Sequence, residues 1–181
     1  MKKGTFLIVV GLIGLMLGIV SMAAGQDELG CVNTWGYWKN HSIYGAHPDP
    51  GWDAIGEDTQ FFGNWEDPPA NTDNLTWYEI LLIPPKKSNV YLILAHQYVA
   101  AWLNIEKGAN PAILGTAIAD AEALLDYYSN SNPSFATYPP AIPKGADEFT
   151  ADDRSWAEEV ASQLDEFNSG MLPGGPPPCD E

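Results

Sequence analysis

The fold is decided by residues 88–110, which read SNVYLILAHQYVAAWLNIEKGAN. Ser88 or Asn89 can cap a helix over residues 90–107, because a short polar side chain accepts a hydrogen bond from a free backbone N–H of the first turn. Gly108 is suited to end that helix. Apolar side chains occur on nearly every side between these two ends, so we expect the helix to be central and covered by its neighbours.

On the C-terminal side the sequence predicts two further helices. Asn110-Pro111 supplies a cap and a first-turn proline for the first of them. Its apolar residues recur at spacings of three and four, at Ile113, Leu114, Ala117, Ile118, Ala121, Leu124, Leu125 and Tyr128. A connection over residues 129–149 follows, which is too long for an unstructured loop, so we expect it to wrap the domain or to serve a function. Thr150 then caps the last helix, which Gly170 ends. The expected inner face of that helix contains Trp156, Val160, Leu164 and Phe167.

On the N-terminal side, Thr76 and Glu79 form a capping box at the start of a short helix, and Pro84-Pro85 ends it. Residues 31–75 show no sustained period. They contain eight aromatic residues, namely Trp35, Tyr37, Trp38, Tyr44, Trp52, Phe61, Phe62 and Trp65. So many aromatic side chains are expected to pack on the helices, within ordered loops and one short helix or strand pair.

These elements predict an all-α domain over residues 26–170, with three longer helices and one short helix. An aromatic, Gly/Pro-rich N-terminal loop region wraps it, and residues 171–181 form a Pro/Gly-rich C-terminal strap. Apolar residues make up 45% of the chain and charged residues 18%, which indicates a folded protein rather than a disordered one.

Residues 1–25 are typical of a secretory signal peptide. Two lysines precede an apolar run over residues 6–20, and small residues follow it. The alternative is a transmembrane anchor, for which the run is short. The sequence contains no second apolar segment of that kind. Export permits a disulfide between Cys31 and Cys179, the two cysteines of the chain.

The charge of the chain excludes several partners. The formal net charge is −16, and the leader holds two of the eight basic residues and no acidic ones, so its removal leaves −18. Nucleic acids and anionic membrane surfaces both attract Lys and Arg, so neither is an expected partner.

Residues 36–41 read GYWKNH, and Cys31 precedes them. Further along are LLIPP at residues 81–85 and LAHQYVAAWLN at residues 94–104, followed by the late Cys179. In these features the chain resembles the "GYWKNH" module of exported bacterial and archaeal proteins, a family of unknown function. The resemblance implies an extracellular or cell-surface location and no particular reaction. Trp102 departs from the pattern, where a small or basic residue is commoner.

The GYWKNH segment is the first candidate site. Tyr37 and Trp38 have flat rings that can stack on sugars, and Lys39, Asn40 and His41 can bond sugar hydroxyls. The other interpretation is that Trp35 and Trp38, which are three positions apart, anchor the loop on the helices. We favour it because buried aromatic residues dominate core energetics.

His96, Gln97 and Asn104 are the polar residues of the apolar central helix. We expect them to satisfy buried backbone groups of the aromatic loop region. A catalytic His96 is the alternative. Residues 41–58 also offer metal-ligand types, in His41, His47, Asp49, Asp53, Glu57 and Asp58, although their spacing matches neither an HExxH site nor an EF-hand.

The sequence contains no GxSxG elbow, P-loop, Rossmann fingerprint or CxxCH motif. We therefore expect a non-catalytic extracellular or cell-surface domain, structural or adhesive, that needs no cofactor and binds polysaccharide or protein through exposed aromatic residues. The alternatives are a secreted hydrolase that uses His41 or His96 with nearby carboxylates, and a calcium-stabilised module. The oligomeric state is not indicated by the sequence.

Overall fold

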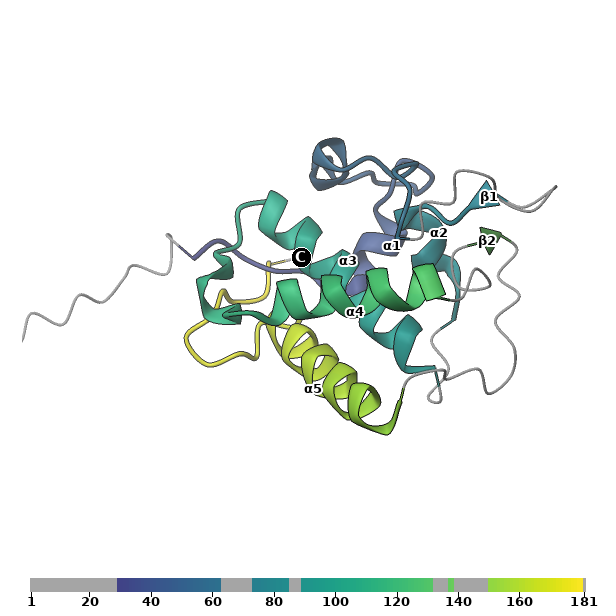
Figure 1. Cartoon of the computed structure of the whole chain (residues 1–181). Helices are drawn as coiled ribbons and strands as arrows, with labels where there is room; N and C mark the ends of the chain where they lie inside the picture. Colours follow the sequence, from purple (N-terminus) through teal and green to yellow (C-terminus); the bar gives the residue numbers. More distant parts are fainter. Residues whose placement is uncertain (1–28, 63–72, 85–88, 132–136, 139–149, 181) are drawn as a thin grey trace, which may run out of the picture.

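The structure, a computed structural model, describes residues 29–62, 73–84, 89–131, 137–138 and 150–180 (Figure 1). The predicted leader, Trp65 and most of the 129–149 connection lie outside these residues. Within them there are three long α-helices and two of six residues, which confirms the all-α fold class. The α-helices are α1 (Trp35–Asn40), α2 (Trp77–Leu82), α3 (Val90–Glu106), α4 (Ala117–Ser131) and α5 (Ala151–Asn168).

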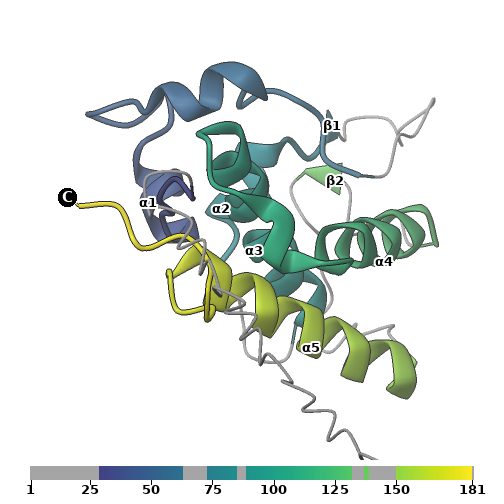
Figure 2. The same ribbon diagram turned by 90° about the vertical axis from the view of Figure 1, so that its left-hand side faces the viewer.

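Helix α3 lies at the centre of the molecule, as its apolar pattern predicts. The Asn89 side chain caps it by accepting a hydrogen bond from the backbone N–H of Leu92, at 3.0 Å. Nearly all of its side chains are buried, and α1, α2, α4 and α5 all pack against it. Figures 1 and 2 show the other helices arranged around this axis.

The helix expected after Asn110 is divided in two. Asn110 caps a 3₁₀ turn, η3, over Pro111–Leu114, and α4 begins only at Ala117. Gly115 lies between them with φ +55°, a conformation that L-residues rarely adopt. A right-handed helix requires negative φ, so the helix cannot continue through this residue. Ile113, predicted to begin the apolar stripe, therefore lies on η3 and is exposed, whereas the stripe from Ala117 to Tyr128 is largely buried as expected.

Helix α5 begins where the sequence predicts, because the Thr150 hydroxyl accepts a hydrogen bond from the backbone N–H of Asp153. Of the predicted inner face, Val160, Leu164 and Phe167 are buried. Trp156 was assigned to that face wrongly, since 40% of it is exposed. Ala157 is the residue of the first turns that enters the core.

The C-terminal strap begins after Gly170, which ends α5 with φ +69°. A β-carbon at this position would lie 2.4 Å from Cδ of Pro178, so glycine also allows the strap to return close to the helix end. The strap then runs beside the first described residues, through a bridge between Val32 and Pro178 (Figure 2).

Helix α2 has the predicted capping box. The Thr76 hydroxyl accepts from the Glu79 backbone N–H at 3.2 Å, and the Glu79 carboxylate accepts from the Thr76 N–H at 2.9 Å. The aromatic region before it contains α1 and a 3₁₀ helix, η2 (Pro50–Ala54). Trp38 and Trp52 are both buried, which confirms that tryptophans of this region serve packing.

Two short strands join the aromatic region to the 129–149 connection. β1 (Asp73–Asn74) pairs with β2 (Thr137–Tyr138) in antiparallel register. Across the ranges given above, no helix combines the length and the apolar character that crossing a membrane requires.

Candidate functional site

The GYWKNH segment forms helix α1, which begins at Thr34. The Thr34 hydroxyl accepts a hydrogen bond from the backbone N–H of Tyr37 at 3.4 Å. This helix directs Trp38 into the core, where it has no exposed surface. Tyr37, Lys39 and His41 are partly covered, and Asn40 is exposed. Trp38 is therefore not available to stack on a ligand, whereas the other four residues of the predicted binding segment reach the surface to some extent.

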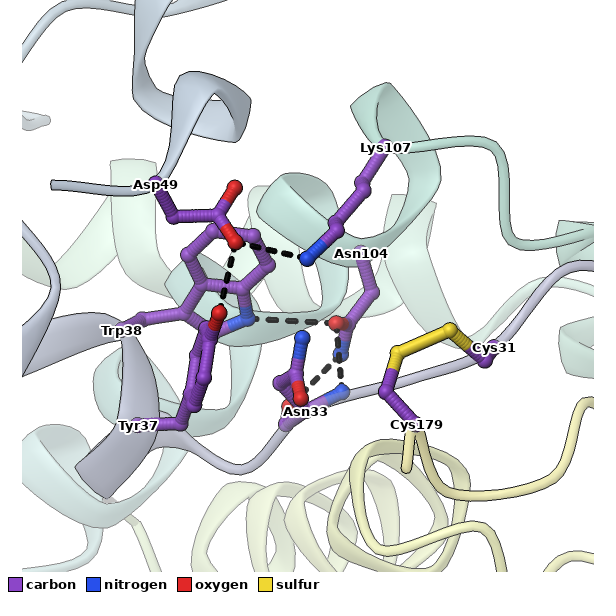
Figure 3. The surroundings of a disulfide bond; sticks show 8 residues. All are labelled: Cys31, Asn33, Tyr37, Trp38, Asp49, Asn104, Lys107 and Cys179. Atoms are coloured by element: carbon purple, nitrogen blue, oxygen red, sulfur yellow. Dashed lines mark hydrogen bonds and ion pairs between the residues drawn. A yellow bond between two sulfur atoms is a disulfide. The ribbon is translucent and has the colours of Figure 1, made fainter. Parts of the chain in front are cut away.

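Asn104 connects the buried end of this segment to the central helix (Figure 3). Its side-chain oxygen accepts hydrogen bonds from the Asn33 backbone N–H at 2.8 Å and from the Trp38 indole N–H at 3.1 Å. Its side-chain nitrogen donates to the Asn33 carbonyl at 2.8 Å and to the Asn168 side-chain oxygen at 2.9 Å. All four hydrogen-bonding positions of the amide are thus used to hold chain segments together.

The disulfide between Cys31 and Cys179 lies beside this node and is present as predicted. The Cα atoms of the two cysteines are 4.9 Å apart. Val32 and the strap exchange two backbone hydrogen bonds of 2.9 Å, one to the Pro177 carbonyl and one from the Cys179 N–H. The covalent link therefore closes a contact that the backbone also makes.

Tyr37, Asp49 and Lys107 form a second cluster, on the outer side of Trp38 (Figure 3). The Asp49 carboxylate accepts hydrogen bonds of 2.6 Å from the Tyr37 hydroxyl and from Lys107 Nζ. Burial alone would raise the pKa of Asp49, but bonds from Lys107, Tyr37 and the Gly51 N–H together lower it. Lys107 Nζ also lies 5.4 Å from the centre of the Tyr37 ring. The cluster fixes the loop before η2 to the end of α3.

His41 completes the outer side of α1 by stacking on Tyr37, with ring centres 3.9 Å apart. Its Nδ1 is hydrogen-bonded to the Tyr37 backbone carbonyl at 2.9 Å, so that nitrogen carries the proton. The histidine of the GYWKNH segment is thus oriented by its own helix.

His96 is 1% exposed and lies under the Trp35 ring, whose centre is 4.8 Å away. Its Nε2 donates a hydrogen bond of 2.8 Å to the backbone carbonyl of Ile80 in α2. Desolvation lowers the pKa of His96 to about 4, because burial disfavours the charged ring. His96 therefore satisfies a backbone group of α2, not of the aromatic loop as expected.

Gln97 also differs from its expected role. Its side-chain nitrogen donates to the Asp165 carboxylate at 2.7 Å, and its side-chain and backbone oxygens both accept from the Asn168 amide at 2.9 Å. Gln97 therefore joins α3 to α5. Of the three polar residues of the central helix, only Asn104 is hydrogen-bonded to the aromatic region, whereas His96 contacts that region through the Trp35 ring.

The acidic residues of the 41–58 region do not come together. Among the described residues, which include all six candidate ligands, no group of three or more His, Cys, Asp or Glu side chains is placed to hold a metal ion. Glu57 instead accepts a hydrogen bond from the Ile43 N–H at 2.7 Å, and Asp58 accepts one from the Tyr44 hydroxyl at 2.9 Å.

A cavity of about 280 Å³ lies between α4 and the first turns of α5. It is lined by Ala123, Leu124, Tyr127, Tyr128, Asp153 and Trp156. Tyr127 is 63% exposed and Trp156 40% exposed, so two aromatic side chains border a hollow that is open to solvent.

Sequence reasoning missed this cavity because it read the inner face of α5 from its large side chains. Trp156 is one position before Ala157, and consecutive residues are turned by about 100° around a helix axis. Ala157 faces the core, so Trp156 lies at the flank. The alanines at 157 and 161 were the signal that could have revealed this orientation.

The chain matches no known family model, no characterised protein and no solved structure in these three comparisons. The resemblance to GYWKNH modules accordingly rests on the residues quoted for it.

Proposed function

We propose that this chain is a non-catalytic extracellular or cell-surface domain that serves a structural or adhesive role and binds polysaccharide or protein through exposed aromatic side chains. The leader predicted from the sequence supports export, and the exposed aromatic residues support the binding role. The observation that carries the proposal is the state of His96, which is buried, uncharged at neutral pH and hydrogen-bonded to a backbone carbonyl.

The other polar residues of the interior support this proposal. Asn104 has all four hydrogen-bonding positions occupied, and Asp49 is bound by Tyr37 and Lys107. A general base needs a proton acceptor within reach of a substrate, and a nucleophile needs a base beside it. In the described ranges, none of the three histidines is hydrogen-bonded to a carboxylate.

The surface offers a different kind of chemistry. Tyr44, Tyr127 and Trp156 are exposed, although burial of such rings would stabilise the fold. Aromatic residues are enriched at binding surfaces because they bring a large contact area with few rotatable bonds. Their exposure favours recognition over catalysis.

The proposal is tested by incubating the purified mature protein with a panel of soluble glycans and peptides. Binding is followed by calorimetry, and product release is followed in the same samples by mass spectrometry. We expect at least one glycan or peptide to bind and none to be cleaved. Release of a product at a rate proportional to protein concentration would contradict the proposal and would favour the hydrolase alternative.

A further inference from the structure

The cavity between α4 and α5 is lined by a hydrogen-bonded carboxylate, that of Asp153, as well as by aromatic side chains. Oδ2 of Asp153 accepts hydrogen bonds from the Tyr128 hydroxyl at 2.6 Å and from the Thr150 hydroxyl at 2.8 Å. These bonds lower the pKa of Asp153, so the carboxylate stays charged in mildly acidic solution. Both bonds go to one oxygen, Oδ2. Asp153 lines the cavity, so a hydrogen-bonded negative charge borders it.

The walls of the cavity are suited to a flat, partly apolar ligand. Ala123 and Leu124 of α4 provide apolar surface. Of the two exposed aromatic residues, Tyr127 belongs to α4 and Trp156 to α5. The volume of about 280 Å³ is just below the usual range for small-molecule sites, about 300–1,000 Å³. This is room for one ring of a ligand rather than for a folded peptide segment.

The charges around the cavity decide which ligand it accepts. The two helices that line the cavity are acidic, with Glu122 and Asp126 on α4 and Asp152 and Glu159 on α5. Arg154 is the one basic side chain on either helix, and it is paired with Glu158 at 3.5 Å. This field repels anionic ligands such as uronic acids and phosphates and attracts a cation. Aromatic faces also attract a cation directly.

We propose that this cavity binds an amino-sugar unit of a polysaccharide, with the apolar face of the sugar ring on Trp156 and Tyr127 and the ammonium group at Asp153. The inference rests on the proposed function, and it names the ligand class of that function. A lysine side chain offers the same ammonium group, but its narrow stem leaves the broad aromatic walls without contact. A neutral sugar offers the ring without the charge.

The test is calorimetric titration of the mature protein with three tetrasaccharides of glucosamine, N-acetylglucosamine and glucose, at low salt and at a pH where the amino groups are protonated. We expect the glucosamine tetramer to bind at least about tenfold more tightly than the other two, a ratio that one charge-assisted contact supplies. Titration of ¹⁵N-labelled protein should shift the amide resonances of Ala123 and Leu124.

Two substitutions in the cavity and one outside it test whether the glucosamine tetramer binds there. Asp153→Asn removes the charge but keeps an acceptor oxygen for Tyr128 and Thr150, so it should fold and should weaken binding at least about tenfold. Trp156→Ala should weaken it similarly. Met171→Ala is the control, because Met171 is an exposed large apolar residue that lies outside the cavity, and it should bind like the wild type.

Several results would overturn the inference. They are the absence of binding by any tetramer, equal affinity for all three, unchanged binding in Asp153→Asn, and a lysine tetrapeptide that binds as tightly with the same sensitivity to the variants. The last result would assign the cavity to a protein ligand. Binding of another glycan that is insensitive to both variants would refute this inference and leave the proposed function intact, whereas cleavage would refute the proposed function.

Discussion

At the scale of single residues, the buried amides of Asn104, Asn168 and Gln97 are hydrogen-bonded in series. Asn104 accepts hydrogen bonds from the Asn33 N–H and the Trp38 indole N–H, and it donates to the Asn33 carbonyl and the Asn168 side-chain oxygen. A buried polar group costs free energy unless it is paired, so each member of such a network depends on the others. The interior of this chain therefore needs specific amides where a purely apolar core would need only volume.

Asn104→Ala should be strongly destabilising. Each buried group left without a partner costs about 1–3 kcal/mol, and the substitution frees several of them, so the free energy of unfolding should fall by about 4 kcal/mol or more. Urea denaturation measures this change. Asn40→Ala is the matched control, because Asn40 is exposed, and it should change the stability by less than about 0.5 kcal/mol. A loss below about 1 kcal/mol for Asn104→Ala would show that the network is not needed.

His96 should make the stability depend on pH in a defined window. Its pKa falls from 6.5 to about 4 on folding, so between these values the unfolded chain binds a proton that the folded chain does not. The contribution of His96 to the free energy of unfolding is therefore fully present above pH 6.5. It decreases as the pH falls from 6.5 toward 4, and it does not change further below pH 4. The total is about 3 kcal/mol, at about 1.4 kcal/mol per pKa unit.

Denaturation at a series of pH values checks this window. His96→Gln should be less stable at pH 7 and should have a flatter profile between pH 6.5 and 4. His47→Gln, which replaces an exposed histidine, should keep the wild-type profile. An unchanged slope in His96→Gln would mean that other groups produce the dependence.

At the scale of elements, the sequence predicts what short-range chemistry determines. The Thr76–Glu79 capping box and the Thr150 cap occur as predicted, and Asn89 is the one of the two predicted caps, Ser88 or Asn89, that caps α3. Each of these caps depends on residues three positions apart. The division at Gly115 was not predicted, because the spacing of apolar residues continues across it. An apolar period alone does not show whether the backbone remains helical.

The candidate site was less predictable than the fold. The sequence places Gln97 and Asn104 on one face of α3, but which element covers that face depends on the packing of helices distant in sequence. Gln97 meets α5, and Asn104 meets both α5 and the aromatic region. The α4–α5 cavity depends on the same packing, and the alanines at 157 and 161 indicate only how α5 is turned, not which helix lies opposite Trp156.

Any side chain at Gly115 should strain the backbone and lower the free energy of unfolding. A β-carbon at this position would meet no atom within 4 Å, so any loss in Gly115→Ala reflects φ +55° alone and should be about 1–2 kcal/mol. Gly36→Ala is the control, since Gly36 is helical and its β-carbon would lie 3.8 Å from the Thr34 hydroxyl. It should be neutral or stabilising by about 0.5–1 kcal/mol. Equal melting temperatures for the two variants would contradict this account.

At the scale of the whole molecule, the first and last described segments close the structure. Cys31 and Cys179 are separated by 148 positions, and a disulfide links them (Figure 3). The neighbouring residues Val32 and Pro178 form a β-bridge. A crosslink over so long a loop restricts the unfolded chain strongly. The disulfide therefore joins the start of the aromatic region to the strap, close to the point where Asn104 joins that region to α3.

Reduction of the disulfide should lower the melting temperature without abolishing the helical core. The chain-entropy estimate for a loop of this length is about 5 kcal/mol, which is an upper figure because the backbone bonds of Val32 remain. Calorimetry with and without reductant measures the change. The double variant Cys31→Ser, Cys179→Ser should melt like the reduced protein and should not respond to reductant. A melting temperature that reduction leaves unchanged would contradict the closing role.

The central claim is that the polar interior holds the fold and performs no reaction, and His96→Ala tests it most directly. The variant loses the hydrogen bond to the Ile80 carbonyl and leaves a space under Trp35. We predict a free energy of unfolding lower by at least about 1–3 kcal/mol, with glycan binding retained at temperatures where the variant is folded. The measurement is the melting temperature of His96→Ala together with its rate of glycan hydrolysis beside that of the wild type. An unchanged melting temperature with loss of a hydrolytic activity that the wild type possesses would contradict the account.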